Sequence, residues 1–430
     1  MRLADLSPHP LPPGLDLPKD VEIAEGVGRT LEEAAARTLG TRIVVASDSR
    51  CAAASRGVLG PLAATGRVVK EWLLPGGGPA DGEAVEALSG AAVDASGILA
   101  VGSGTINDVA KMAASRCGLP YVVLGTAASM NGYASGIASI LEDGLKTTRS
   151  ARPPRAILLD TRILQEAPPE LTRAGLGDLL SKSVSTGDWW ISHRLEGSPF
   201  SELACELVDA ALERVLGSAR GLATGDLSSL EELARALVLS GVSMVVAGSS
   251  SPASGGEHLL SHLWDMEALS RNRPLRLHGA QVGVATLITS ALYHRVIGLE
   301  EPSFPALRPW HEEAARIDRE HGALSASITG PARRKHAGAI RRSEALRQTW
   351  PRLREELARR RIPEPAAIRT PLEQAGAPRR LSDLGLSRQD ARRTLLGARD
   401  IRDRLTVLDL AFELGVLPDG ADAVLDAAGV

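Results

Sequence analysis

The sequence has few cysteines, and they stand far apart. Its 430 residues contain three, Cys51, Cys117 and Cys205. An odd number of widely separated cysteines argues against a disulfide framework and against a metal site of the Cys-x-x-Cys kind. We therefore expect a protein of a reducing compartment, the cytoplasm.

A strong net charge and a long hydrophobic run are also lacking. The 49 lysines and arginines nearly balance the 52 aspartates and glutamates, so electrostatics gives no reason to expect a nucleic acid or an anionic membrane as partner. The longest apolar stretch, residues 236–248, is too short to cross a bilayer and predicts a buried helix. The proline-rich start lacks the features of a signal peptide, and we expect residues 7–18 to form an extended arm.

The order of the secondary-structure signals predicts an α/β part followed by an all-helical part. Short β-branched runs first alternate with helical segments, which is the pattern of a parallel sheet with crossover helices. The predicted strands are 41–46, 68–74, 97–101, 121–124 and 156–160, with helices at 31–39 and 81–88 among them. After Pro169 the strand signal ends, and the predicted helices are 201–216, 230–248, 279–297, 331–361 and 387–414.

A glycine-rich turn, called the first loop here (residues 102–105), follows the third predicted strand. Gly102 and Gly104 precede a helix that begins near Thr105. Glycines let a ligand approach the backbone, and a helix N-terminus favours phosphate. The loop is not a Walker A motif, and Asn107 stands where Gly-x-Gly-x-x-Gly has its last glycine. An ordinary tight turn is therefore the alternative to a diphosphate site.

The next predicted strand runs into another loop of small residues, called the second loop here (residues 125–133). Adjacent polar loops at the carboxyl ends of parallel strands form the crevice in which open sheets bind ligands. The second loop therefore favours the diphosphate interpretation of the first.

Histidines and an acidic residue suggest a metal site. Three of the nine histidines are His258, His262 and His278. The first two are four residues apart and project from one helix face. Together with Asp178 they offer the one carboxylate and two imidazoles of an open catalytic metal site. A surface or core histidine pair and a helix N-cap at Asp178 are the alternatives, and the spacing does not say which three groups bind.

Several segments in this order resemble the sn-glycerol-1-phosphate dehydrogenase branch of the iron-containing alcohol dehydrogenase superfamily. These segments are residues 101–108, 126–133, 177–182, 254–262, 277–283 and 398–408. The resemblance implies a dehydroquinate synthase-like fold. Residues 1–162 would form an α/β NAD(P)-binding domain with a parallel sheet, and residues 163–430 an all-α metal- and substrate-binding domain.

The resemblance also implies roles for single residues. Asp178, His258 and His278 would ligate one divalent metal, zinc in the first place, although nickel, iron and manganese suit the same ligands. His262 would face the substrate and act with Asp178 in catalysis. The residues implied to bind the NAD or NADP cofactor are Gly102, Ser103, Gly104, Thr105, Asp108, Thr126, Ser129 and Ser135.

Further positions bear on which substrate and which cofactor are bound. The family usually has Asp where this chain has Asn131, at a position that touches substrate hydroxyls, so the exact substrate stays open. Lys182 either meets a substrate phosphate or is a solvated helix lysine. Asp48 would accept a hydrogen bond from the adenosine ribose and favour NAD, whereas Arg50 would favour the 2′-phosphate of NADP.

These expectations combine into a metal-dependent NAD(P)-linked oxidoreductase that interconverts a small phosphorylated polyol and its ketone. The metal would polarise the carbonyl, and hydride would pass to or from the nicotinamide. His262 would donate or accept the proton of the substrate hydroxyl. One alternative is an NAD- and metal-dependent cyclising lyase of the dehydroquinate synthase type, and another is a non-catalytic nucleotide-binding protein. We expect a homo-oligomer that acts on a small molecule.

Overall fold

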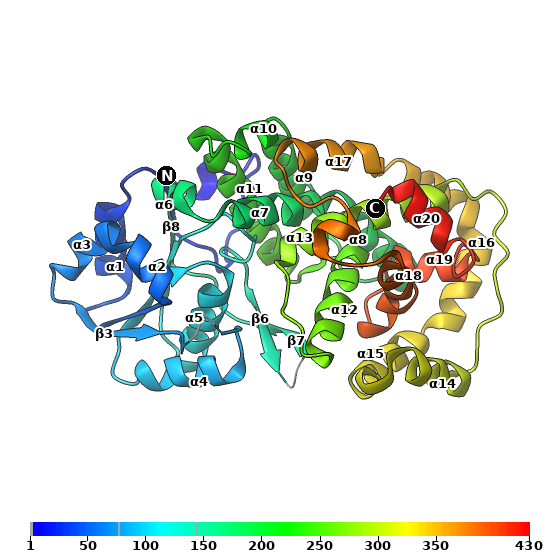
Figure 1. The fold of residues 1–430 in the computed structure, drawn as a ribbon, viewed down its shortest axis with the longest axis horizontal. Coiled ribbons are helices and arrows are strands. Elements are labelled where there is room, and N and C mark those ends of the chain that lie inside the picture. Colours follow the sequence, from blue (N-terminus) through cyan, green and yellow to red (C-terminus); the bar gives the residue numbers. More distant parts are fainter. Residues whose placement is uncertain (1–2, 76–77, 143–144) are drawn as a thin grey trace. The chain divides into compact units, whose positions relative to one another are not determined.

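The computed structural model describes residues 3–75, 78–142 and 145–430 (Figure 1). Its internal contacts divide the chain into two compact units. Unit 1 consists of Met1–Leu179 and Leu203–Ser250, and unit 2 of Leu180–Glu202 and Ser251–Val430. The division into domains at residue 162 stays a prediction.

Unit 1 is built on a parallel sheet. Its six strands lie in the order β1-β8-β5-β4-β2-β3. In that order they span Asp20–Ala24, Ala156–Asp160, Tyr121–Gly125, Gly97–Gly102, Ile43–Ser47 and Val68–Leu73. Every residue of the four central strands is buried, as expected where helices cover both faces of a parallel sheet. The predicted α/β architecture is confirmed.

The core on one face of this sheet follows the two-residue period of the strands. Val45, Leu99, Leu124 and Leu158 pack in one cluster with Leu31 of helix α1. The helices of unit 1 are α1 Gly28–Thr38, α2 Ser49–Ala54, α3 Arg56–Ala63, α4 Gly82–Ala91, α5 Gly104–Cys117, α6 Thr161–Glu166, α7 Pro169–Leu180, α9 Glu202–Leu216, α10 Ala219–Leu222 and α11 Leu227–Ala247.

All five predicted strands are present, but the sequence reasoning missed three others. Strand β1 is short and has alternating burial, because it lies at the edge of the sheet. Strands β6 (Ile137–Glu142) and β7 (Leu145–Ser150) form a separate antiparallel pair. Beyond Asp160, the described part of the chain contains no further strand, as predicted.

Unit 2 is helical and surrounds one buried helix, α13 (His278–Ile297). Every α13 residue from Gly279 to Tyr293 is buried, and a helix that is buried on all sides lies at a core. Around it lie α8 Lys182–Glu196, α12 Gly256–Ser270, α16 Ala339–Ala358, α17 Pro365–Gln374, α19 Val407–Glu413 and α20 Ala421–Ala428. The other helices are α14 Trp310–His321, α15 Ser325–His336 and α18 Arg388–Gly397.

Two long predicted helices are broken in the structure. The helix predicted at 331–361 is α15 and α16, which the Ala337–Gly338 step separates. The one predicted at 387–414 is α18 and α19, because Arg402 is extended and Thr406 starts a new helix with a capping box. None of the described helices combines the length and the apolar composition needed to span a bilayer.

The second loop packs directly against two helix backbones of unit 1. A Cβ atom on Gly175 in α7 would lie 1.9 Å from the Ala128 carbonyl oxygen, and one on Gly241 in α11 would lie 2.5 Å from the Asn131 carbonyl oxygen. Because real Cβ atoms essentially never come within 3.0 Å of another atom, the position of this loop depends on glycine at both sites.

We predict that Gly241→Ala destabilises the protein by about 1–3 kcal/mol, because the added methyl group displaces the second loop. The matched control is Gly90→Ala in α4, where a Cβ meets nothing within 4 Å. There the higher helix propensity of alanine should stabilise by up to about 1 kcal/mol. Urea unfolding followed by circular dichroism measures both changes, and an equal effect of the two substitutions contradicts the close contact.

A buried lysine holds the end of the second loop and the segment that leads into β6. The Lys111 ammonium group, in α5, donates to the carbonyl oxygens of Gly132 (2.6 Å), Ser135 (2.9 Å) and Ile137 (2.9 Å). The side chain is completely buried, and burial lowers the pKa of its amine to about 8. Lys111 thus serves as a structural cation, not a surface charge.

Lys111→Met should cost about 1–3 kcal/mol of stability, because it leaves buried carbonyl groups without a donor. It should also weaken NAD(H) binding, if the second loop lines the cofactor site. Lys70→Met on the exposed edge strand β3 is the control and should stay within about 0.5 kcal/mol of the wild type. Unfolding midpoints and cofactor titrations measure these effects. Wild-type stability in Lys111→Met would refute the role of the ammonium group.

Candidate metal and cofactor centre

The first loop forms the predicted turn between a buried strand and a helix. Strand β4 ends at Gly102, and α5 begins at Gly104. A Cβ atom on Gly102 would lie 2.6 Å from Cβ of Ile106, so the turn has room only for glycine there. Asn107, at the position of the absent third glycine, is fully buried, and its amide donates to Asp108 Oδ1 at 3.1 Å.

The two loops lie next to each other, as the sheet order requires for β4 and β5. The Thr126 N–H donates to the Gly102 carbonyl at 3.2 Å. The Tyr133 hydroxyl lies 3.3 Å from the same oxygen and 2.9 Å from the Ala127 carbonyl. Ser135 is buried, and its hydroxyl accepts from Lys111 at 3.0 Å. The cofactor contacts of both loops stay predictions.

Asp48 follows β2, but it caps a helix. Its Oδ1 accepts from the N–H groups of Arg50 and Cys51, both at 2.9 Å, at the start of α2. The Cys51 thiol lies 3.3 Å from Asp48 Oδ2 and 3.4 Å from the Thr126 hydroxyl. Burial, together with the Asp48 carboxylate, raises the pKa of this thiol to about 11. The thiol is therefore neutral at physiological pH, and the ribose contact of Asp48 stays a prediction.

In unit 1, Asp178 is linked to the second loop. It is 2% exposed and lies in the last turn of α7, so the alternative of a helix N-cap is wrong. Its Oδ2 accepts from the Asn131 N–H at 3.2 Å. The Asn131 side-chain amide donates to the Ser240 hydroxyl of α11 at 3.2 Å. The residue that departs from the family pattern thus orients the carboxylate through its backbone.

In unit 2, three histidine rings lie together. The ring centroids of His258 and His278 are 5.1 Å apart, and those of His262 and His278 are 5.5 Å apart. His258 and His262 lie on α12, and His278 is the first residue of α13. The ligand atoms of His262, Asp265 and His278 lie within 4.8 Å of one another, a spacing that suits a metal ion.

Hydrogen bonds to Nδ1 fix the orientation of the His258 and His278 rings. His258 Nδ1 lies 2.7 Å from Glu257 Oε1, and His278 Nδ1 lies 3.2 Å from the Ser261 hydroxyl. A carboxylate only accepts, so His258 carries its proton on Nδ1 and its lone pair on Nε2. Metal-binding histidines are usually held in this way by a hydrogen bond to the other ring nitrogen.

A second buried carboxylate lies behind Glu257. Asp188 Oδ2 accepts from the Gly256 N–H at 2.6 Å, and its Oδ1 accepts from the Tyr293 hydroxyl at 2.5 Å and from the Val407 N–H at 2.6 Å. Burial, together with the nearby Glu257 carboxylate, raises the pKa of Asp188 to about 7. Asp188 therefore links the first residue of α12, Gly256, to the first residue of α19, Val407. Gly256 directly precedes Glu257.

Lys182 is not the solvated helix lysine that was one alternative. Its side chain is fully buried in unit 2, and its ammonium group donates to the Ala253 carbonyl at 3.0 Å and the Ser181 hydroxyl at 3.1 Å. The contact with a substrate phosphate stays a prediction. Sequence reasoning did not single out Ser240 or Lys111, because their partners are distant in the chain. It also did not single out Glu257, whose partner His258 is the next residue, because only the structure shows how the two side chains are oriented.

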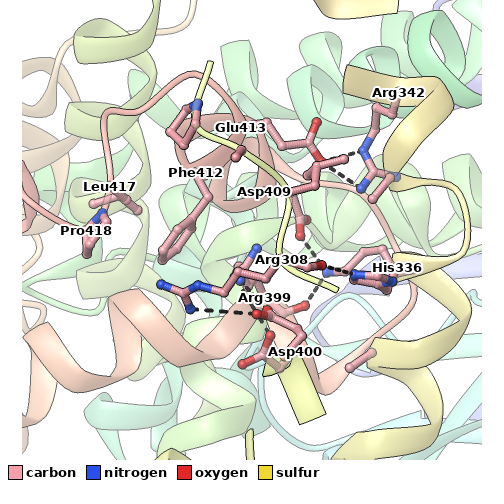
Figure 2. Close-up of a pocket in the computed structure, with 17 residues that line it drawn as sticks. Arg308, His336, Arg342, Arg399, Asp400, Asp409, Phe412, Glu413, Leu417 and Pro418 are labelled. Carbon is pink, nitrogen blue, oxygen red and sulfur yellow. Dashed lines mark hydrogen bonds and ion pairs between the residues drawn. The ribbon is translucent and has the colours of Figure 1, made fainter. Parts of the chain in front are cut away.

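A separate pocket in unit 2 has a volume of about 170 Å³ (Figure 2). Its charged side chains pair with one another. Arg342 lies 2.7 Å from Glu413, and Lys335 lies 2.7 Å from Asp409. Among the described residues that line it, none is a predicted site residue. The pocket is thus lined by a network of ion pairs, and it does not include the histidine cluster.

Curated proteins similar to this chain include several dehydrogenases. The model of the family described as iron-containing alcohol dehydrogenase matches residues 22–168. A glycerol-1-phosphate dehydrogenase (NAD(P)+) of Bacillus velezensis is 42% identical over 196 residues, 46% of this chain and 50% of that protein. One of Bacillus licheniformis is 30% identical over 334 residues, 78% of this chain and 72% of that protein. The chain thus matches between 50% and 72% of the length of these relatives.

A solved structure supports the fold assignment. A probable glycerol dehydrogenase from Sinorhizobium meliloti superposes with a TM-score of 0.62 at 18% identity, over 96% of this chain and 97% of that one. At this identity the similarity shows the fold alone. From the family model and the long match to the Bacillus licheniformis protein, it follows that this chain belongs to the glycerol-1-phosphate dehydrogenase branch of the iron-containing alcohol dehydrogenase family.

Proposed function

We propose that the protein is a metal-dependent NAD(P)-linked dehydrogenase that interconverts sn-glycerol 1-phosphate, or a closely related phosphorylated polyol, and its ketone. The relatives' names support the reaction and the substrate class. The observation that carries the proposal for this chain is the histidine cluster of unit 2, in which Nδ1 of His258 and of His278 is hydrogen-bonded.

The proposed metal ligands are Asp178, His258 and His278. The residues fit a divalent cation such as zinc, nickel, iron or manganese. Both imidazoles are oriented through Nδ1, and Asp178 is a buried carboxylate whose Oδ2 is held by the second loop. When bound, the metal supplies Lewis acid chemistry to a substrate oxygen.

The chain's own residues would perform the remaining tasks. His262 would give or take the proton of the substrate hydroxyl, a task that imidazoles commonly perform as general acids and bases. Asn131 would hydrogen-bond a substrate hydroxyl through its side-chain amide. The N–H groups of the first loop and the start of α5 would bind the cofactor diphosphate. Thr126 and Ser129 would lie on the nicotinamide side.

Cofactor preference, location and assembly complete the proposal. Asp48 would accept a hydrogen bond from the adenosine ribose and thereby favour NAD, although Arg50 beside it suits the 2′-phosphate of NADP. The three scattered cysteines fit a reducing cytoplasm. We further propose a homo-oligomer, and mass measurement by light scattering tests it.

The reaction is tested by following NADH absorbance with dihydroxyacetone phosphate and zinc-loaded or nickel-loaded protein. We expect one NADH to be consumed for each glycerol 1-phosphate formed. After chelation of the metal, we expect no NADH consumption and no glycerol 1-phosphate. The cyclising lyase alternative predicts no net change in NADH at equilibrium, since such an enzyme returns its cofactor oxidised. Substrate turnover without NADH consumption would therefore exclude the dehydrogenase.

Alanine substitutions separate the roles of the histidines. We predict that His258→Ala and His278→Ala abolish activity and lower the metal content. His262→Ala should retain the metal but lower kcat about 10²–10⁴-fold, the usual effect of losing a general acid or base. The control is His311→Ala, whose side chain is 81% exposed. Metal analysis by mass spectrometry alongside kinetics measures this, and equal metal loss in all three variants would overturn the assignment.

Asn131 tests the substrate preference. Asn131→Asp should raise activity on glycerol 1-phosphate or dihydroxyacetone phosphate if this residue sets the preference, because it restores the family's charge and a second acceptor oxygen. The Ser240 hydroxyl can turn to donate to the new carboxylate. Asn131→Ala is the control and should lower kcat/KM. If the aspartate variant behaves like the alanine variant, Asn131 does not set the substrate preference.

A further inference from the structure

A row of three buried polar side chains, Ser261, Gln281 and Asp265, leads from His278 to an acid on the neighbouring helix. His278 Nδ1 lies 3.2 Å from the Ser261 hydroxyl. That hydroxyl donates to Gln281 Oε1 at 2.8 Å, and Gln281 Nε2 donates to Asp265 Oδ1 at 2.9 Å. Ser261 and Gln281 are fully buried, and Asp265 is 4% exposed. Water therefore has little access to the part of the row between Ser261 and Asp265.

The acid sets the direction of every hydrogen bond in the row. A carboxylate only accepts, so the Gln281 amide turns its NH₂ group toward Asp265 and its oxygen toward Ser261. The Ser261 proton is then used in the bond to that oxygen. The serine oxygen is left to accept, and its partner, His278 Nδ1, must donate. His278 therefore carries its proton on Nδ1 and its lone pair on Nε2.

We infer that Asp265, Gln281 and Ser261 are positioning residues that hold His278 in the tautomer required of a metal ligand. This inference rests on the proposed function, in which His278 binds the metal. His258 receives the same tautomer from one carboxylate in direct contact, Glu257. His278 receives it through two neutral groups, because the acid lies one helical turn further along α12.

Each member of the row is required for a definite reason. Without the Ser261 hydroxyl, the row no longer holds the imidazole proton on Nδ1. Without the Asp265 carboxylate, the Gln281 amide can turn over and present NH₂ to Ser261. The serine then donates to Nδ1, and the proton of His278 moves to Nε2, where it blocks the metal. Loss of such supporting bonds typically weakens metal binding about 10–100-fold.

The test is the zinc affinity of the full-length, metal-free protein, measured by competition with a chromophoric chelator. We expect Ser261→Ala and Asp265→Ala each to weaken zinc binding about 10–100-fold. Ser261→Thr, which keeps the hydroxyl, should restore most of the affinity. The matched control is Ser290→Ala, a buried serine of α13 that donates to the Pro363 carbonyl at 2.6 Å, and it should leave the affinity unchanged.

Three outcomes are distinguishable. If His278→Ala binds zinc normally, the proposed metal site itself is wrong. If His278→Ala loses zinc while Ser261→Ala and Asp265→Ala retain it, the inference is overturned and the proposed function stands. If Asp265→Ala loses zinc but Ser261→Ala does not, Asp265 acts as a direct ligand with His262, and the inference is again overturned. Thermal melting of the metal-free variants identifies any that fail to fold.

Discussion

An imidazole presents a lone pair on only one of its two nitrogens, and the hydrogen bond to the other nitrogen decides which. The proposed chemistry of this protein depends on that constraint at His258 and His278. The Glu257 carboxylate faces Nδ1 of the first, and the Ser261 hydroxyl faces Nδ1 of the second. Glu257 Oε1 also accepts from the Gly255 N–H at 2.8 Å. The start of α12 and the orientation of a histidine ring thus share one buried acid.

In unit 1, hydrogen bonds between side chains and the backbone likewise hold the second loop in place. The second loop accepts a hydrogen bond from the Lys111 ammonium group at Gly132, and its Asn131 N–H donates to Asp178. Because Gly175 and Gly241 admit the loop against the helix backbones, no side chain intervenes there. A loop that is held from several sides keeps its geometry without a ligand, and binding then costs less ordering entropy.

The sequence pattern predicted the elements that depend on neighbouring residues alone. The buried strands and the first loop follow from β-branched runs and glycine spacing, and the structure contains them. Contacts between distant residues gave no such signal. Gln281 lies inside a motif of the family, but only the fold shows that it links Ser261 to Asp265. No element was predicted for the segment of the β6–β7 pair. One helix was predicted over 331–361 because its apolar periodicity outweighed Gly338, which stands at the break between α15 and α16.

The most direct measurement is the ¹⁵N NMR spectrum of histidine-labelled protein, recorded without metal and during titration with zinc. We predict that His258 and His278 carry the proton on Nδ1 without metal. Their Nε2 resonances should shift at one equivalent of zinc, while His262 keeps the spectrum of an uncoordinated ring. A proton on Nε2 of either His258 or His278, or zinc coordination by His262 in place of one of them, would contradict this prediction.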